Sequence, residues 1–287
     1  MRPLAEALAA AEQADIVCLA TPAEASAELA PKILALGKRV VDLSGAFRLP
    51  DPAQFRAVYG FEHPAPALAR EAHYGLRQLP GAAGGKPIEE ARLVANPGCY
   101  ATSAILPLAA LLESGLIEDS PIFIDGKSGI TGAGRKLAEK FLFTEVAENL
   151  SAYRVLSHQH EPEMELALSR LANRPIEVHF VPHLIPIRRG ILTTIYGRTK
   201  AGVTQEALTE ALRAFYADHA SPFEGPVVRT MSADEVQTQA VWGTPACHMG
   251  VRVDTTRGRF AAVSAIDNLM KGAASQALEN VLAMLSA

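Results

Sequence analysis

The N-terminal third of the chain alternates short apolar runs with helical patterns. Residues 14–20 and 39–43 are short and mostly apolar, which is typical of parallel strands that are covered on both faces. Residues 23–36 between them have a helical pattern. A strand, a helix and a strand in this order form a βαβ unit, and such units bind ligands at the carboxyl ends of their strands. We therefore expect a ligand near Thr21-Pro22 and Ser44-Gly45.

The rest of the chain changes to a pattern that is rich in strands. Residues 122–125, 176–185 and 191–198 are β-rich, and residues 247–254 and 259–266 predict a hairpin. Helical patterns are set apart from these strands, at residues 101–113, 204–217 and 268–285. Strands in succession, with helices set aside, predict an α+β domain on a mostly antiparallel sheet.

The sequence predicts an α/β fold in which the first domain is incomplete. No Gly-x-Gly-x-x-Gly follows any predicted strand, and no strand precedes the opening helix, residues 2–13. We expect a truncated Rossmann-like parallel-sheet domain over residues 1–97, completed by a C-terminal helix, 267–287. Residues 98–266 are expected to form an α+β domain with a mostly antiparallel sheet. Without the glycine turn, dinucleotide binding is expected to be weakened.

Composition is that of an ordinary soluble globular protein. Apolar residues make up 49% of the chain, charged residues make up 20%, and the formal net charge is −4. The absence of a basic run argues against nucleic acid, and charges interrupt every apolar run before it is long enough to span a membrane. Cys18, Cys99 and Cys247 are too few and too widely spaced for a disulfide framework, which favours a cytoplasmic location. Cys18 lies in a predicted buried strand and is expected to be inert.

Cys99 is the candidate nucleophile. It follows the turn residues 96–98 and precedes the predicted helix 101–113, for which Thr102 and Ser103 are available as caps. Unpaired N–H groups and the dipole at a helix N-terminus stabilise a thiolate, which is the nucleophilic form of cysteine. A small buried hydrophobic residue is the alternative interpretation of Cys99.

His158, His160 and Glu163 form the second polar cluster. One histidine is enough to act as a base beside the thiol, and a carboxylate can orient it. A zinc site needs at least one further convergent ligand, and the other histidines form no second spaced pair. A structural histidine pair is a further alternative.

Two other segments have the composition of an anion site. The loop Gly126–Arg135 carries four glycines with serine, threonine, lysine and arginine, and its N–H groups could approach a phosphate. A flexible surface loop explains the same composition. Arg188 and Arg189 could clamp an anion or could be solvated surface charges.

Together, these segments resemble the family of N-acetyl-gamma-glutamyl-phosphate reductases, enzymes of arginine biosynthesis that are related to aspartate-semialdehyde dehydrogenase. The matching segments follow the family's order along the chain: residues 40–51, 59–63, 74–76, 94–102, 127–135, 158–163, 182–186, 189–192 and 265–274. The chain departs from the family at its opening strand and glycine turn, which are absent. It also has Pro245 where the family usually has asparagine, so a polar side chain is missing at that point.

The resemblance implies an NADPH-dependent reduction of N-acetyl-γ-glutamyl phosphate to N-acetylglutamate semialdehyde, with release of phosphate, through a thioester on Cys99. His160 or His158 would be the general acid/base, and Glu163 its partner or a substrate contact. The resemblance also implies two sets of binding residues. Those for substrate are Arg48, Arg189 and Asn96, and those for NADP are Thr21, Pro22, Ser44, Gly45, Ser128, Gly129, Gly132, Gly134 and Asn268. The resemblance further implies that residues 98–266 form the catalytic and dimerisation domain. No metal is expected, and the implied assembly is a homo-oligomer, either a dimer or a tetramer.

Two other functions compete with this one. A related acyl-phosphate reductase that acts on an aminoadipyl or aspartyl substrate would share the same thiol chemistry. The segments 127–129 and 158–163 favour the glutamyl enzyme. The second alternative is a catalytically impaired fragment that only folds and dimerises, which the missing glycine turn would explain.

Overall fold

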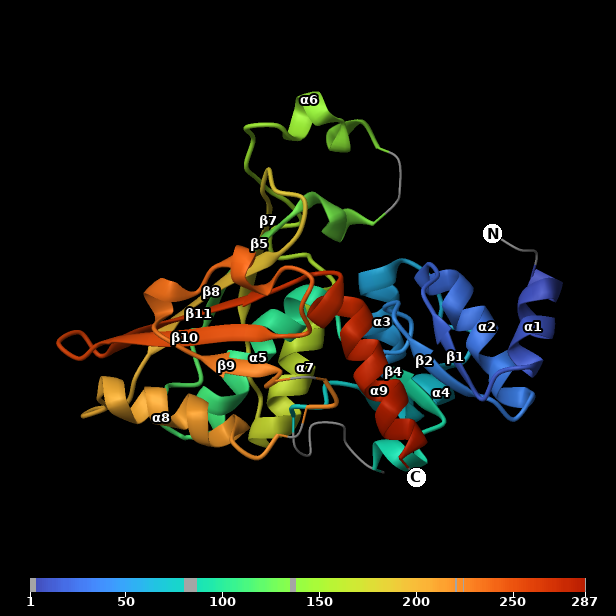
Figure 1. Ribbon diagram of the computed structural model, residues 1–287, viewed down its shortest axis with the longest axis horizontal. Helices are drawn as coiled ribbons and strands as arrows, with labels where there is room; N and C mark the ends of the chain where they lie inside the picture. Colours follow the sequence, from blue (N-terminus) through green and yellow to red (C-terminus); the bar gives the residue numbers. More distant parts are fainter. Residues whose placement is uncertain (1–3, 80–86, 135–137, 220, 224, 287) are drawn as a thin grey trace. The chain divides into compact units, whose positions relative to one another are not determined.

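The computed structural model describes residues 4–79, 87–134, 138–219, 221–223 and 225–286 (Figure 1). The chain forms two compact units, one of residues 1–98 and 276–287 and the other of residues 99–275. Residues 267–275 were expected in the first unit but cluster with the second. The side chains of Asp267 and Asn268 explain this difference, because they hydrogen-bond to Gly243 and Gly190 of the second unit.

The first unit is built on a four-stranded parallel sheet in the order β1-β2-β4-β3. Its strands are β1 (Ile16–Leu19), β2 (Arg39–Asp42), β3 (His73–Tyr74) and β4 (Leu93–Ala95). Val40 and Val41 of β2 are fully buried and belong to two different apolar clusters. Consecutive strand residues point to opposite faces, so a strand that is covered on both faces is apolar throughout. The predicted parallel βαβ unit is confirmed.

Helices cover this sheet, and two of them lie where no helix was predicted. The helices are α1 (Leu4–Glu12), α2 (Ala23–Ala35), α3 (Pro52–Tyr59), α4 (Pro66–Glu71) and α9 (Ser275–Leu285). Asp51 caps α3 by accepting a hydrogen bond of 2.7 Å from the Gln54 backbone N–H, and proline suits the first helical position. The predicted final helix, 268–285, is divided, because a π-helical turn, Met270–Ala274, precedes α9.

The expectation that Cys18 is buried was wrong. β1 is an edge strand of the described sheet, and within it only Leu19 is buried, whereas Cys18 is exposed. Partial desolvation raises the pKa of the Cys18 thiol, so the group stays protonated near neutral pH. Slow alkylation of Cys18 is therefore expected from protonation and not from burial.

The second unit is built on a seven-stranded mixed sheet in the order β6-β7-β5-β8-β11-β10-β9. Its strands are β5 (Phe123–Ser128), β6 (Ser151–Ala152), β7 (His179–Leu184), β8 (Ile191–Arg198), β9 (Val228–Thr230), β10 (Cys247–Asp254) and β11 (Arg259–Ile266). The β5–β7 and β9–β10 pairs are parallel, and the other neighbouring pairs are antiparallel. The predicted hairpin is confirmed in β10 and β11, which pair from Cys247↔Ile266 to Asp254↔Arg259.

A buried helix forms the centre of the second unit. The helices of this unit are α5 (Cys99–Glu113), α6 (Phe143–Val146), α7 (His160–Ala172) and α8 (Gln205–Tyr216). The buried helix is α5, which packs against α7, α8, β8 and β11. Thr102 and Ser103 lie inside α5 and are fully buried, so the prediction that they cap the helix was wrong. The Ser103 hydroxyl lies 2.6 Å from that of Thr193, and the Ser264 hydroxyl donates to the Ser103 carbonyl. These bonds fix the buried helix to the sheet.

Candidate active site

Cys99 is the first residue of α5, and its side chain is partly buried. The helix therefore begins two residues earlier than the sequence predicted, which brings the thiol into its first turn. The backbone N–H groups of a first turn have no partner within the helix, and the helix dipole favours negative charge there. The first turn of α5 contains no acidic side chain. This position is suited to a thiolate.

The π-helical turn Met270–Ala274 packs directly against this cysteine. A Cβ atom added at Gly272 would lie 2.7 Å from the Cys99 Cβ and 3.3 Å from the Cys99 Cα. Those distances are too short for a side chain, so only glycine lets the turn approach the thiol. Short π-helical turns are rare and occur frequently at functional sites.

His158 is held as a neutral capping group at the start of α7. The His160 backbone N–H donates to the His158 Nδ1 at 3.1 Å, and the two rings lie 4.7 Å apart between centroids. Burial, followed by the charges of His160 and Arg154, lowers the pKa of His158 to about 2. A histidine that stays neutral and uses its Nδ1 in this way is poorly suited to exchange protons near pH 7. His160 is the better candidate for the acid/base.

Two tyrosines connect the histidines to the cysteine. The Tyr100 ring contacts the rings of His158 and His160, with centroids 5.6 Å and 6.1 Å away. The Tyr153 hydroxyl donates to the Tyr100 hydroxyl at 3.3 Å, and that hydroxyl donates to the His183 carbonyl at 3.0 Å. Burial raises the pKa of both tyrosines, to about 12 for Tyr153, and the negative charge of Cys99 acts in the same direction. Sequence reasoning missed both tyrosines, although Tyr100 follows Cys99 directly.

Glu163 lies in the first turn of α7 and is almost fully buried. It follows His160 by three residues, which places both side chains on one side of the helix. The carboxylate acts to raise the pKa of His158, against the effect of burial. The structure thus brings Glu163 together with the predicted histidine pair.

A cavity of about 530 Å³ opens beside these groups. The residues that line it come from β5, β6, β7 and the segments that follow β5 and precede α6 and α7: Ser128, Gly132, Ala133, Ala138, Lys140, Phe141, Ser151, Tyr153, Arg154, His158, Gln159 and Leu184. It therefore joins two of the predicted cofactor residues, Ser128 and Gly132, to the histidine cluster. Ser128 also contacts the Tyr100 hydroxyl.

Backbone hydrogen bonds to residues 187–190 order the glycine-rich segment at the end of β5. Gly126 to Ser128 belong to β5, and the backbone N–H groups of residues 129, 130 and 131 donate to carbonyls of residues 190, 187 and 188. These donors are therefore engaged, which argues against both the phosphate cradle and the flexible loop. A Cβ at Gly129 would lie 2.8 Å from the Ile187 carbonyl oxygen, so this glycine permits close backbone packing. Arg135 lies outside the described residues.

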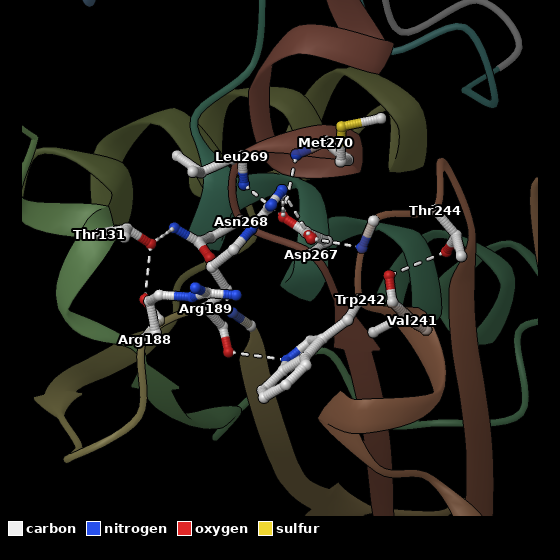
Figure 2. Close-up of polar contacts among 12 residues, drawn as sticks. Thr131, Arg188, Arg189, Val241, Trp242, Thr244, Asp267, Asn268, Leu269 and Met270 are labelled. Carbon is white, nitrogen blue, oxygen red and sulfur yellow. Dashed lines mark hydrogen bonds and ion pairs between the residues drawn. The ribbon is translucent and has the colours of Figure 1, made fainter.

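Asp267 and Asn268 connect this segment to the rest of the unit (Figure 2). The fully buried Asp267 carboxylate lies 3.0 Å and 2.9 Å from the Arg189 Nη2 and also accepts from the Gly243 N–H. The Asn268 Oδ1 accepts from the Gly190 N–H at 2.7 Å, and its Nδ2 donates to Thr131 at 3.0 Å. Figure 2 shows that Trp242 completes the group by donating to the Arg189 carbonyl.

These contacts change how Arg189 is interpreted. Its guanidinium is compensated by a buried carboxylate, so the charge expected to hold a substrate anion already has a partner within the protein. Sequence reasoning placed Asp267 in a family segment but gave it no role. An aspartate between strand β11 and the π-helical turn was the available signal.

The substrate residues predicted in the first unit are held by its own backbone and side chains. The Arg48 guanidinium donates to the carbonyls of Leu43 and Asn96 at 2.9 Å and 2.8 Å. The Asn96 side chain accepts from Asn280 of α9 at 3.0 Å. These contacts fix the carboxyl ends of β2 and β4, and direct contacts of Arg48 and Asn96 with substrate stay predictions.

The predicted cofactor residues of the first unit lie at the carboxyl ends of β1 and β2. Ser44 donates to the Asp42 carboxylate at 2.8 Å, and any Cβ at Gly45 would collide with the Tyr59 side chain. Pro22 precedes α2, which has no side-chain cap, so its first-turn N–H groups are available donors. Uncapped N–H groups at the end of a parallel strand fit the phosphate or ribose groups of a dinucleotide.

The residues that the structure describes contain neither a cluster of metal ligands nor a membrane-spanning helix. There, no three side chains of the metal-binding types histidine, cysteine, aspartate and glutamate converge on one point. Within the same residues, every helix is too short or too polar to cross a bilayer.

His158 gives the folded protein a specific pH dependence. Because its pKa falls from 6.5 to about 2, the unfolded chain binds a proton below about pH 6.5 that the folded chain does not bind. This one group then lowers the free energy of unfolding by at most about 1.4 kcal/mol for each pH unit below that point. His158→Asn keeps an acceptor for the His160 N–H and removes the titration, so this variant should lose less stability between pH 7 and pH 5.

Urea unfolding at the two pH values measures the difference. Burial also lowers the pKa of His63 and His248, but these groups are present in both proteins and cancel in the comparison. Equal losses of stability in the wild type and in His158→Asn would contradict the assignment of a neutral His158.

Two family models match the chain. The semialdehyde dehydrogenase NAD-binding domain matches residues 3–80, and the semialdehyde dehydrogenase dimerisation domain matches residues 99–268. The first domain indicates a nicotinamide cofactor.

Similar solved structures include two aspartate-semialdehyde dehydrogenases. The enzyme II from Vibrio cholerae matches with a TM-score of 0.72 and 17% identity, covering 96% of this chain and 81% of that one. The enzyme from Francisella tularensis matches with a TM-score of 0.71 and 15% identity, covering 98% and 84%. At such identities the likeness shows the fold alone, and it confirms the predicted fold class.

Relatives at higher identity are named N-acetyl-gamma-glutamyl-phosphate reductase. The protein from Dehalococcoides mccartyi is 46% identical over 274 residues, which cover 95% of this chain and 77% of the relative. The protein from Symbiobacterium thermophilum is 44% identical over 269 residues, which cover 93% and 74%.

The fold and the site define a protein of the semialdehyde dehydrogenase class, with a nicotinamide-binding unit and a second unit that begins at Cys99. Within that class, the chain belongs to the N-acetyl-gamma-glutamyl-phosphate reductase family. The resemblance stated from the sequence is confirmed.

Proposed function

We propose that this chain reduces N-acetyl-γ-glutamyl phosphate to N-acetylglutamate semialdehyde and releases phosphate, with NADPH as the reductant, in arginine biosynthesis. The observation that carries the proposal is the position of Cys99 at the start of α5, with the tyrosine and histidine cluster beside it. The names of the relatives supply the substrate.

Cys99 performs the first half of the reaction. Its thiolate attacks the acyl carbon, a C–S bond forms, and the bond between that carbon and the phosphate oxygen breaks with its electron pair leaving on phosphate. The product is a thioester on Cys99. When bound, the reduced nicotinamide supplies a hydride to the thioester carbon.

His160 handles the proton in the second half. It protonates the oxygen of the tetrahedral adduct on Cys99 and takes that proton back when the carbonyl re-forms. In the same step the C–S bond breaks, its electron pair leaves on the Cys99 sulfur, and the aldehyde is released. Glu163 orients the histidine cluster, and the neutral His158 caps α7 so that His160 keeps its place.

The residues proposed for the cofactor fall into two groups. Its phosphate and ribose groups are assigned to the strand ends at Thr21, Pro22, Ser44 and Gly45, where the uncapped α2 offers donors. Ser128, Gly129, Gly132, Gly134 and Asn268 are assigned to the nicotinamide side. Two of these, Ser128 and Gly132, line the cavity beside His158, which supports that assignment.

A homo-oligomer is part of the proposal. α5 and α8 pack on one face of the seven-stranded sheet, while Phe123 and Tyr196, paired on neighbouring strands, are about half exposed. A second copy of the chain that packs on this open face would bury both rings. We also propose a cytoplasmic location, which the three free cysteines support.

A substrate comparison tests the proposed reaction. The oxidation of NADPH is followed by absorbance with the glutamyl, aminoadipyl and aspartyl acyl phosphates in parallel. We expect N-acetyl-γ-glutamyl phosphate to give the highest kcat/KM. A preference for either of the other two would replace the proposed substrate, and no turnover with any of them would support the impaired fragment.

A further inference from the structure

Two cationic side chains face the cavity beside the histidines. Among the described residues that line it, Lys140 and Arg154 carry the positive charges. The arginines that the sequence favoured as anion ligands are engaged elsewhere, Arg189 with the buried Asp267 and Arg48 with backbone carbonyls. The proposed reaction assigns no role to the two cations of the cavity wall.

The Arg154 guanidinium is exposed but held in place. Its Nη1 donates to the Oε1 of Gln159, which also lines the cavity and directly precedes α7. A guanidinium has five N–H donors, so Gln159 engages only part of its capacity. Arg154 also has a left-handed backbone, with φ of 45°. Such conformations are uncommon outside glycine and persist where the surroundings hold them, often at ligand sites.

Arg154 lies within electrostatic reach of two side chains of the site, His158 and Tyr153. Its charge lowers the pKa of His158 and that of Tyr153, and a negative Cys99 raises the pKa of the same Tyr153. His158 and Tyr153 both line the cavity. A substrate that enters the cavity would therefore have its anionic groups near this guanidinium.

We propose that Arg154, with Lys140 beside it, binds an anionic oxygen group of the substrate in this cavity. The inference rests on the proposed function, which gives the substrate two such groups, a carboxylate and a phosphate. The planar fork of a guanidinium can bind the paired oxygens of either group, and lysine adds a point charge. Arg154 is a substrate-binding residue in this account and takes no part in proton transfer.

The reverse reaction separates the two anionic groups, because N-acetylglutamate semialdehyde brings the carboxylate and inorganic phosphate is added separately. We expect Arg154→Met to raise the KM of one of these two substrates by about 10- to 100-fold, with a small change in kcat, since a charge-assisted hydrogen bond is lost. Arg154→Lys should recover part of the loss. A higher KM for the semialdehyde would show that Arg154 binds the carboxylate. A higher KM for inorganic phosphate would show that Arg154 binds the phosphate group.

Arg213→Met is the matched control, because Arg213 is an exposed arginine on α8 and is not part of the cavity lining. It should leave both KM values unchanged. Unchanged KM values in Arg154→Met, or equal increases in the Arg213 variant, would overturn the inference.

A second measurement does not depend on turnover. Alkylation of Cys99 by iodoacetamide is timed with increasing N-acetylglutamate or increasing inorganic phosphate. One of these probes should slow alkylation of the wild type, and Arg154→Met should need at least about tenfold more of it for half-protection. Protection that is equal in the two proteins, or absent in the wild type with both probes, overturns the inference. If protection depends on Arg154 but the wild type shows no reductase turnover, the proposed function is contradicted and the binding role of Arg154 stands.

Discussion

Cys99→Ala is expected to abolish reductase turnover, with a loss of at least about 10⁴-fold, because the substitution removes the thiol that forms the thioester. The helix should remain intact, since alanine is the best helix former and the side chain of Cys99 is only partly buried. Turnover is measured by NADPH absorbance, and folding by circular dichroism and thermal unfolding. Substantial turnover in a folded Cys99→Ala variant would show that the reaction does not use this thiol.

The other two cysteines are the matched controls. Cys18→Ala changes an exposed side chain in the first unit and should leave kcat unchanged. In the wild type, iodoacetamide should label Cys99 first near neutral pH. Cys247 should stay unlabelled, because complete burial raises the pKa of its thiol to about 12. Cys18 should react slowly and faster above pH 9, as its raised pKa requires.

His160→Asn is expected to lower kcat by about 10²-fold or more, which is the usual contribution of a general acid/base. His158→Asn should lower it much less, because His158 already stays neutral near pH 7 and acts as a cap for α7. The two variants make the same substitution at positions two residues apart. His160→Asn reports on proton transfer, and His158→Asn reports on support of the helix. A larger loss in His158→Asn than in His160→Asn would reverse the assignment.

Elements with a strong periodic pattern were predictable from the sequence. β10 and β11 have the predicted bounds, and α2 and β2 each end within one residue of the predicted end. In these elements the spacing of apolar residues follows directly from which side chains are buried. The sequence pattern did not predict the helix α7, because its first turn, His160 to Glu163, is polar and indicates a cluster of functional groups instead. Its start depends on a hydrogen bond to His158 Nδ1, which no periodicity reveals.

The candidate site was predictable in its reactive groups but not in its partners. Cys99, His160 and Glu163 stand out by residue type, and the structure links them to one cluster through Tyr100 and His158. The buried carboxylate that neutralises Arg189 comes from a position 78 residues away. Pairings of that kind depend on how sheets and turns meet in space, so the sequence could not distinguish an anion clamp from an internal ion pair.

The most direct test of the central claim is to trap the thioester. The protein is mixed with N-acetyl-γ-glutamyl phosphate in the absence of NADPH, quenched in acid, digested and analysed by mass spectrometry, while released phosphate is measured in parallel. The thioester mechanism predicts an N-acetylglutamyl group on the peptide that contains Cys99, in step with the release of phosphate. Release of phosphate without that adduct, or an adduct on Cys18 instead, would contradict it.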